Sequence, residues 1–433
     1  MSDEPRIPRG RLRRLGKLAA LTTKVGSGLV SSQAKKLLGG EGDPKVEAAR
    51  HVLATLGELK GAALKLGQTL SLGGDHLPPE VKRVVSKLFS QAPTLPYEQI
   101  AKVIHEEFGA SPRTLYARFD EAPFAAASLG QVHAARLHTG EEVAVKVQYP
   151  GVATALADDL NNAETVVRAL GIGGSLLDGR AYFDELKREI GAELDYRREL
   201  DLLEKFRGYL ARWPDLVVPR AYPSLCGDRV LTLERLVGPT LHEYSQRTDT
   251  SAQERFEVGE RLARAIYGPF LFHRAIHGDA HPGNFVVMDG GRLGVLDFGS
   301  VKQLSEAFWR CYCEAFAAGL AGGHPDLPSL VRRGGFTLGI PDERAKPLLE
   351  EIARIVGKPL RGPYDFGADD MVEQLIALKQ AHMMDMVRIR PPPEAILFYR
   401  AIGGLSYNLR QLKANGNFRL FIEAAIAELG PLG

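Results

Sequence analysis

The spacing of apolar and polar positions changes several times along the chain. Near the N-terminus, and again over residues 47–72, apolar side chains recur every three or four positions. That spacing places them along one side of an α-helix. We therefore expect an amphipathic helix within the first forty residues, and further helices over 47–72, before Leu95 and over 97–108.

Between residues 116 and 149 the apolar positions alternate instead. Residues 142–147 read Glu-Val-Ala-Val-Lys-Val and follow a Thr139-Gly140 pair. Alternation on both sides of a glycine-containing turn predicts a β-hairpin, and short β-branched runs later in the chain predict more strands. The strands expected are 134–137, 142–147, 217–218 and 230–234.

Helical spacing returns from residue 152 to about 209, and again from residue 252 onward. A short hairpin interrupts the second stretch between residues 285 and 296. Strands first and helices later, with a transition near 237–239, indicate an α+β protein with a small β-rich lobe before a larger α-rich lobe.

The composition is that of a globular protein with balanced charge. Hydrophobic residues make up 45% and charged residues 25% of 433, and the formal net charge is +2, which gives no reason to expect a nucleic-acid partner. Three cysteines, Cys226, Cys311 and Cys313, are too few for a disulfide framework and lack the neighbours of a zinc site. We expect a reducing compartment, no transmembrane helix and no secretory signal.

The N-terminal segment has a basic polar face. Lysines and arginines in the first forty residues are opposed only by Asp3 and Glu4. Such a helix can lie on an anionic membrane surface, where each nearby Lys or Arg adds about 1 kcal/mol. A solvated helix packed on the protein and a cleaved organelle transit peptide are the alternatives that the sequence leaves open.

Residues 277–284 and 296–299 carry the strongest chemical signal. Asp279 and Asn284 have the spacing of the protein-kinase catalytic loop, H-R-D-x-x-x-x-N, and Asp297 begins a D-F-G motif after the expected hairpin. Carboxylate and amide oxygens hold Mg²⁺ in phosphoryl-transfer enzymes. The two motifs together predict a protein-kinase-like fold that binds Mg²⁺ with ATP or ADP, with Asp279 catalytic and Asn284 and Asp297 as metal ligands.

The chain upstream of these motifs has a matching phosphate-binding region. Lys146 ends a Val-Ala-Val-Lys strand, where kinases have the lysine that binds the α- and β-phosphates. In the preceding loop, alanines occupy the first two glycine positions of G-x-G-x-x-G-x-V. Because Cβ atoms restrict the backbone and the approach of a phosphate, we expect this loop to hold the terminal phosphate differently. We assign nucleotide binding to Ala125, Ala126, Ala127, Ser128, Gly130, Val132, Lys146, Glu234 and Leu236.

Two departures argue against an ordinary protein kinase. No A-P-E motif follows D-F-G, because a helical pattern begins almost at once, at Glu306. The catalytic loop also has Gly278 where H-R-D has the arginine that pairs with a phosphorylated activation loop. These features fit a small-molecule kinase or an ATPase.

Together the motifs resemble the UbiB family of atypical kinase-like proteins, also called the AarF or ADCK family, over nearly the whole chain. Lys65 and Gln68 match its K-x-G-Q motif, Glu193 and Asp195 match its E-x-D motif, and the alanine-rich loop is a family hallmark. Residues 11–38 and 364–367 are most similar to the subgroup linked to coenzyme Q biosynthesis.

This resemblance implies further roles that the residues alone do not show, since Lys65 and Gln68 could otherwise be solvated side chains. It implies that the K-x-G-Q helix folds over the active site and excludes peptides. It also implies that Glu193 and Asp195 meet that helix and hold metal, and that Glu199 pairs with the strand lysine. The organisation expected is a membrane-associating segment (1–40), a helical extension with K-x-G-Q (41–112), a kinase-like N-lobe with a helical insertion (113–237) and a kinase-like C-lobe (238–433).

The function expected from the resemblance is an atypical kinase or ATPase that supports ubiquinone biosynthesis or lipid handling at a membrane. Its expected partners are a nucleotide, an anionic lipid or isoprenoid-quinone precursor, and quinone-biosynthesis proteins. The expected location is cytoplasmic with peripheral membrane association, or mitochondrial in a eukaryote. A protein kinase acting in trans and a nucleotide-gated scaffold are the alternatives.

Overall fold

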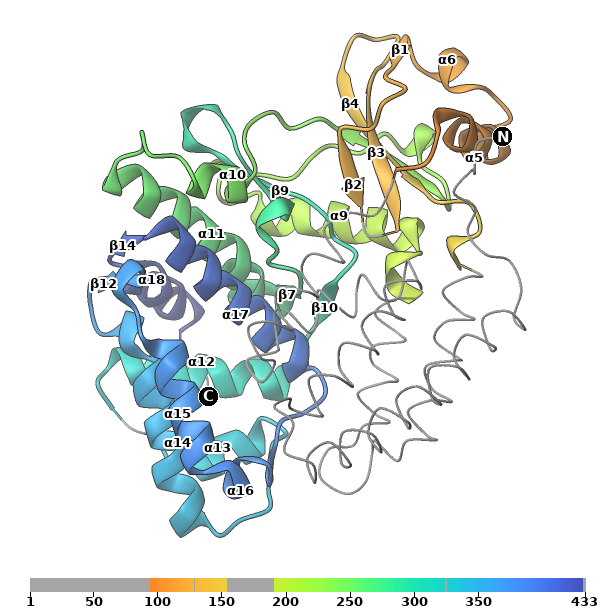
Figure 1. Ribbon diagram of the computed structural model, residues 1–433. Helices are drawn as coiled ribbons and strands as arrows, with labels where there is room; N and C mark the ends of the chain where they lie inside the picture. Colours follow the sequence, from red (N-terminus) through yellow and green to blue (C-terminus); the bar gives the residue numbers. More distant parts are fainter. Residues whose placement is uncertain (1–93, 128, 154–190, 324, 431–433) are drawn as a thin grey trace, which may run out of the picture. The chain divides into compact units, whose positions relative to one another are not determined.

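The computed structural model describes residues 94–127, 129–153, 191–323 and 325–430. These residues belong to two compact units. The first unit extends to Asp195 and includes Ser224–Thr232, and the second contains Tyr196–Pro223 and Leu233–Gly433. The first is built around one sheet and the second mainly from helices (Figure 1), which confirms the α+β class.

The first unit contains a sheet in the order β1-β3-β4-β6, with β2 added beside β3. The β1–β3, β2–β3 and β3–β4 pairs are antiparallel. Pairing of β3 with β4 runs from Gly130 opposite Gln148 to Arg136 opposite Glu142. Val143, Val145 and Val147 of β4 are fully buried, as the alternating pattern predicts. The strands are β1 (Arg118–Phe119), β2 (Ala125–Ala127), β3 (Gly130–Arg136), β4 (Glu142–Gln148) and β6 (Val230–Glu234).

Two short helices precede this sheet. Helix α5 covers Tyr97–Phe108, the range predicted, and α6 covers Pro112–Leu115. Ile100, Val103 and Ile104 of α5 are buried, and α5 packs against β4. The helix ends where Gly109 adopts a φ of 69°, a left-handed conformation that glycine accepts without a steric cost.

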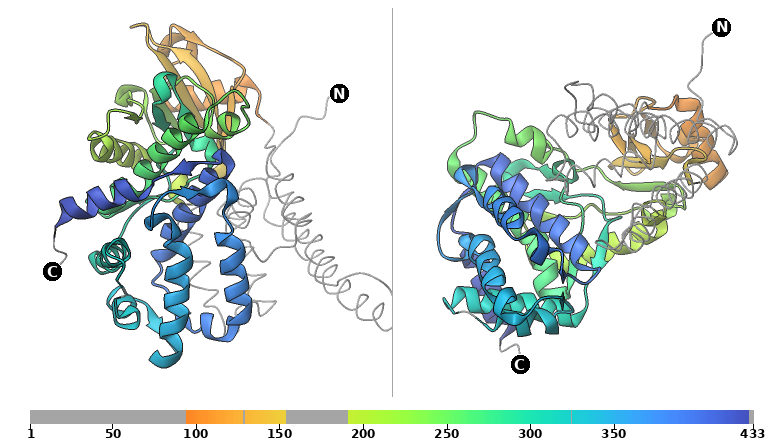
Figure 2. Two further views of the ribbon diagram at one scale, coloured as in Figure 1. Left: turned by 90° about the vertical axis from the view of Figure 1, so that its left-hand side faces the viewer. Right: turned by 60° about the horizontal axis from the view of Figure 1, so that its bottom comes forward.

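In the second unit, α11 (Ala252–His273) lies in the middle of the core. Figures 1 and 2 show α17 (Ala395–Leu412) and α18 (Arg419–Leu429) beside it. Phe270 of α11 and Phe398 of α17 are buried, with ring centroids 4.9 Å apart. The other helices are α9 (Tyr196–Leu210), α10 (Leu241–Ser245), α12 (Glu306–Leu320), α13 (Leu327–Arg333), α14 (Asp342–Val356), α15 (Met371–Ala381) and α16 (Met383–Met386).

The strands of this unit are short. They form a three-stranded sheet, β5-β9-β8, and three two-stranded pairs, β7-β10, β11-β13 and β12-β14. Apart from the hairpin, the predicted helical region after residue 252 did not include these pairs, because two or three residues are too few to show alternation. The strands are β5 (Leu216–Val217), β7 (Ala275–His277), β8 (Phe285–Val287), β9 (Leu293–Val295), β10 (Val301–Gln303), β11 (Thr337–Leu338), β12 (Tyr364–Asp365), β13 (Ile389–Arg390) and β14 (Asn415–Gly416).

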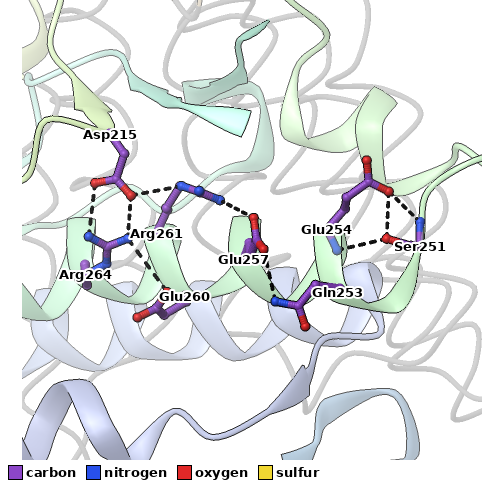
Figure 3. Close-up of polar contacts among 8 residues, drawn as sticks. All are labelled: Asp215, Ser251, Gln253, Glu254, Glu257, Glu260, Arg261 and Arg264. Carbon is purple, nitrogen blue, oxygen red and sulfur yellow. Dashed lines mark hydrogen bonds and ion pairs between the residues drawn. The ribbon is translucent and has the colours of Figure 1, made fainter. Parts of the chain in front are cut away.

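Polar contacts along α11 fix its start and attach the sheet to it (Figure 3). Ser251 and Glu254 form a reciprocal capping box, in which each side chain accepts a hydrogen bond from the other's backbone N–H. Asp215 accepts bonds from Arg261 Nε at 3.0 Å and from Arg264 Nη1 at 3.0 Å. Its backbone carbonyl accepts from the N–H of Leu293 at 2.9 Å, so these arginines hold the start of β5 and β9 against α11.

The main sequence-based predictions of local structure agree with the described residues. The expected hairpin at 285–296 is β8 and β9, the helix from residue 252 is α11, and the three cysteines are free and buried. The helix expected over 47–72 and most of the one from residue 152 lie outside the described residues. The boundaries of the predicted domains stay a prediction. No helix in the described part of the chain combines the length and apolar character needed to cross a membrane.

Candidate nucleotide and metal site

In the second unit, short strand pairing brings the two acidic motifs together. His277 at the end of β7 lies opposite Val301 at the start of β10. The N–H of Gly278 then donates to the carbonyl of Ser300 at 3.1 Å. A Cβ on residue 278 would lie 2.4 Å from that same oxygen. Gly278 therefore lets the H-G-D segment approach the chain after D-F-G, which is a structural reason for the missing arginine.

The β8–β9 hairpin places Asn284 beside the D-F-G motif. Phe285 lies opposite Val295, and one residue further on the N–H of Leu296 donates to the carbonyl of Asn284 at 2.8 Å. Asp297 follows directly. The hairpin thus brings the backbones of the two predicted metal ligands, Asn284 and Asp297, close together, although both strands of the hairpin lie between them in the sequence.

Asp279 and Asn284 contact each other directly. Asn284 Nδ2 donates to both the backbone carbonyl and Oδ2 of Asp279, each at 3.1 Å. With its amide nitrogen engaged in this way, Asn284 has its carbonyl oxygen Oδ1 as the atom for a metal. The contact thus joins the predicted catalytic carboxylate to a predicted metal ligand.

Asp297 has an unusual backbone for an aspartate. Its φ is 56°, in the left-handed region that few non-glycine residues adopt. Its Oδ1 accepts a hydrogen bond from the N–H of Gly299 at 3.2 Å, which turns the carboxylate back along its own loop. Residues held in this region cluster at functional sites, because surrounding structure must compensate for the strain.

Aromatic packing holds the rest of both motifs in the core. Phe298 of D-F-G is 1% exposed, and its ring lies 5.5 Å from that of His277 and 5.5 Å from that of Phe206 on α9. His277 Nε2 is 3.1 Å from the carbonyl oxygen of Leu296, so this nitrogen carries the proton and donates. The imidazole therefore links the catalytic loop to the residue before Asp297.

In the first unit, the predicted phosphate loop is a tight hairpin of β2 and β3. Ala125 lies opposite Val132, Ala127 lies opposite Gly130, and Val132 lies opposite Lys146 on β4. The pairing therefore brings these five nucleotide candidates onto three neighbouring strands, with Ala126 between them. Ser128 lies outside the described residues.

Gly130, the one glycine of the kinase loop motif that this chain retains, is required by the packing of neighbouring strands. A Cβ on Gly130 would lie 2.2 Å from the carbonyl oxygen of Val147, so only glycine allows β3 and β4 to pair here. Glycine is thus required for the close strand pairing, whichever nucleotide is bound.

The other predicted residues are placed as follows. Glu199 is buried on α9 in the second unit, whereas Glu193 and Asp195 lie just before α9 in the first unit. Glu234 accepts a hydrogen bond from the N–H of Arg220 at 3.1 Å, and Leu236 packs on Gly294 of β9. Lys65 and Gln68 lie outside the described residues.

The donor set of the second unit suits magnesium. Mg²⁺ is usually bound by one or two carboxylates together with phosphate oxygens, and not by a cage made wholly of protein ligands. Asp297 and Asn284 are such a set. Among the described residues no group of three or more His, Cys, Asp or Glu side chains could hold a metal, so a zinc-type centre is not seen in that part of the chain.

Reasoning from the sequence missed three residues that contact this region. Arg198 on α9 donates to the carbonyls of Gly299 at 2.9 Å and Val301 at 3.2 Å. Arg400 and Asn408, both on α17, donate to carbonyls of the catalytic loop. A buried asparagine within an apolar helix was the one clue available from the pattern of residues.

Comparison with known proteins agrees with this geometry. Residues 87–324 match the ABC1 atypical kinase-like domain. The chain is 31% identical to atypical kinase COQ8B, mitochondrial, of Rattus norvegicus, over 96% of this chain and 80% of the relative. It is also 31% identical to atypical kinase coq-8, mitochondrial, of Caenorhabditis elegans, over 95% of this chain and 57% of the relative.

A solved structure shares the fold. The protein in the complex of Rv3197 with erythromycin from Mycobacterium tuberculosis aligns with a TM-score of 0.64 and 27% identity, over 93% of this chain and 98% of that one. Atypical kinase COQ8, mitochondrial, of Saccharomyces cerevisiae is 29% identical over 80% of this chain and 70% of its own length. On these matches and on its motifs, the chain belongs to the ABC1 atypical kinase-like family, also called the UbiB family.

Proposed function

We propose that this protein binds magnesium with ATP or ADP and acts as an atypical kinase or ATPase that supports ubiquinone biosynthesis at a membrane. The observation that carries the proposal is the junction of Asp279, Asn284 and the D-F-G segment in the second unit. Its hydrogen bonds join the catalytic loop to the residue before Asp297. This is the residue set that phosphoryl transfer requires.

Each residue has a defined task in this proposal. Asp297 and Asn284 would hold the magnesium, which would supply positive charge to neutralise the phosphates. Asp279 would orient the acceptor and take its proton. Lys146 would bind the α- and β-phosphates and Glu199 would pair with Lys146, as in the family pattern.

The acceptor in this proposal is water, the protein itself or a small lipid-like molecule, and not a protein in trans. Helix α12 begins at Glu306, soon after D-F-G, where a protein kinase has the segment that ends in A-P-E and docks a peptide. Lys65 and Gln68 would cover the active site from the N-terminal extension, where Lys65 would meet Glu193 or Asp195. An ammonium group in a cleft is costly unless carboxylates pair with it.

The proposed pathway and location rest on the relatives. The rat, worm and yeast proteins are named as mitochondrial COQ8-type kinases, and the chain spans 57–80% of their lengths. We propose a role in making ubiquinone, with an anionic lipid or isoprenoid-quinone precursor and quinone-biosynthesis proteins as partners. Peripheral membrane contact through residues 1–40 belongs to the same proposal.

Asp297→Asn tests the metal assignment. In the unchanged protein, nucleotide at a hundredfold excess over its dissociation constant should add about 2.7 kcal/mol to stability. With Asp297→Asn, the part of this gain that requires magnesium should disappear, because the amide removes the ligand charge. Thermal unfolding with nucleotide, with and without magnesium, measures it.

Asp289→Asn is the matched control, because Asp289 is exposed at the opposite end of the same hairpin. This variant should keep the magnesium-dependent shift. A full shift in Asp297→Asn would show that the metal is bound elsewhere.

Lys65→Ala tests the position of the extension. Loss of the lysine would leave Glu193 and Asp195 without a partner from that helix, so the relative affinities for ATP and ADP should change and autophosphorylation should increase. Nucleotide titration and phosphate transfer to the protein itself are the measurements. Unchanged nucleotide preference and turnover would contradict this part of the proposal.

A further inference from the structure

We infer that Arg400 and Asn408 of α17 are positioning residues, which set the orientation of Asp279 by binding the backbone on both sides of it. The inference rests on the proposed function for its chemistry. The contacts themselves lie wholly within the second unit.

Two hydrogen bonds from α17 bracket Asp279. Arg400 Nε donates to the carbonyl of Gly278 at 2.7 Å, and Asn408 Nδ2 donates to the carbonyl of Ala280 at 2.7 Å. Gly278 and Ala280 are the immediate neighbours of Asp279. Both carbonyls are therefore directed at the same helix, one residue before and one residue after the catalytic carboxylate.

Three residues of α17 lie on the side of the helix that contacts the catalytic loop. Arg400, Gly404 and Asn408 are four residues apart, so they share one face of the helix. A Cβ on Gly404 would lie 2.8 Å from the Cβ of Ala280. Glycine in the middle of the face thus lets the loop lie directly on the helix, between the two donors.

Asp279 itself is bound by Asn284. The backbone carbonyl and Oδ2 of Asp279 both accept from Asn284 Nδ2 at 3.1 Å. The carbonyls of Gly278 and Ala280 accept hydrogen bonds from α17. The oxygens of Asp279 itself accept from Asn284, a predicted metal ligand. Three donors therefore fix this part of the loop, and loss of Arg400 or Asn408 would remove a bond that holds the backbone beside Asp279 on α17.

Arg400 also reaches the D-F-G segment. Its Nη2 donates to Ser300 Oγ at 3.2 Å, while its Nε binds Gly278. The same two chain segments are already joined by the bond between Gly278 and Ser300. One guanidinium therefore binds both the catalytic loop, at Gly278, and the segment that follows D-F-G, at Ser300.

The burial of Asn408 argues against a role in stability alone. Its side chain is 1% exposed, and its Oδ1 has no hydrogen-bond partner among the described residues. A buried polar atom without a partner destabilises a protein, and the surrounding face of α17 is apolar, with Leu405 and Leu409 buried. The amide keeps one unpaired buried oxygen in order to donate to the buried carbonyl of Ala280, so this donation to the catalytic loop explains why an asparagine stands here.

The test compares Arg400→Gln and Asn408→Ala with matched changes on the same helix. Arg410→Gln removes a half-buried arginine that pairs with Glu373, and Gln411→Ala removes an exposed amide. Hydrogen–deuterium exchange over residues 277–284 needs no nucleotide. It should become faster in both test variants, stay unchanged in both controls, and leave the exchange of α11 unaltered.

Phosphate release with magnesium ATP supplies the second readout. In Arg400→Gln and Asn408→Ala, kcat should fall by about 10- to 100-fold with little change in KM, because the bound nucleotide keeps its contacts while Asp279 loses its orientation. Arg400→Lys retains one donor and should recover part of the loss. Both controls should turn over normally.

The two readouts separate the inference from the proposed function. Unchanged exchange of residues 277–284 in both test variants would overturn the inference, whether or not the protein hydrolyses ATP. Faster exchange throughout the second unit would also overturn it, since that outcome indicates general destabilisation. Failure of the unchanged protein to bind magnesium with nucleotide would overturn the proposed function, and local exchange would still report on the loop.

Discussion

His133 of β3 is a buried residue whose neighbours determine its protonation. Its Nδ1 lies 2.8 Å from the backbone carbonyl of Asp120, which can only accept, so Nδ1 carries the proton. Nε2 then accepts from Gln131 Nε2 at 2.9 Å. Gln131 also bonds to the N–H of Leu95 at 2.8 Å, so the neutral imidazole helps to fix the segment that leads into α5.

This arrangement predicts a pH dependence of stability. Burial lowers the pKa of His133, although the hydrogen bond to Asp120 acts in the opposite direction. The unfolded chain, with a histidine pKa of about 6.5, takes up the proton first as the pH falls. The contribution of neutral His133 to stability is therefore present above pH 6.5 or so and is lost below it.

Urea unfolding at pH 7.5 and pH 5.5 measures the effect. His133→Gln should reduce the loss of stability between the two pH values, even if it lowers stability at both. His138→Gln, which changes an exposed histidine of the same unit, should leave the difference as it is. Equal pH dependence in His133→Gln and the unchanged protein would rule out the predicted coupling.

At the scale of the element, two residues of the β2–β3 hairpin, Gly130 and Ala127, limit the backbone in different ways. Gly130 is required because β4 passes so close to β3. Ala127 lies directly opposite it, at the end of β2, and β2 pairs with β3 alone in the sheet. The alanine therefore narrows the conformations of a strand end that has few other contacts to hold it.

Ala127→Gly should change the balance between ATP and ADP affinity. Glycine and alanine differ by about 0.5–1 kcal/mol in conformational free energy, so we expect a two- to fivefold change in the ratio of the two dissociation constants. Isothermal titration with each nucleotide measures the ratio. Ala117→Gly is the control, because it adds the same flexibility at an exposed position of the same unit that has no assigned role in nucleotide binding. The same ratio in Ala127→Gly as in the unchanged protein would refute the prediction.

At the scale of the whole molecule, charge is unevenly distributed along the chain. The formal net charge is +2, whereas the first forty residues are strongly basic, with leucines at helical spacing among the basic residues. None of the described helices could span a membrane. The predicted contact with lipid rests on the basic residues and the leucine spacing of this N-terminal segment.

Deletion of residues 1–40 should reduce flotation with anionic liposomes, because each Lys or Arg near the surface adds about 1 kcal/mol of attraction. Binding of the full chain should weaken at high salt, as screening predicts. A full-length variant with Arg11, Arg13 and Arg14 changed to Gln keeps the leucines and isolates the charge. Equal flotation of the full chain and the deletion would exclude this segment as the anchor.

Local features of the sequence were sufficient for much of the fold and site. Alternation predicted β4, and helical spacing predicted α5 and the start of α11, because both periods arise from backbone geometry within a few residues. Asp279 and Asn284 could be predicted together because only five positions separate them on one loop. Resemblance to a family was needed for Glu193, Asp195 and Glu199, whose local pattern is an ordinary polar helix.

Tertiary structure alone decided what surrounds that loop. Arg400 and Asn408 lie 122 and 128 residues after the carbonyls they bind, and no local period connects them. The reasons for Gly130 and Gly278 likewise appear only when the opposing carbonyl is placed. The sequence by itself determined which residues could perform the chemistry, because residue type and short spacing are local. Which residues orient them depends on packing between distant segments, and that is a property of the folded chain.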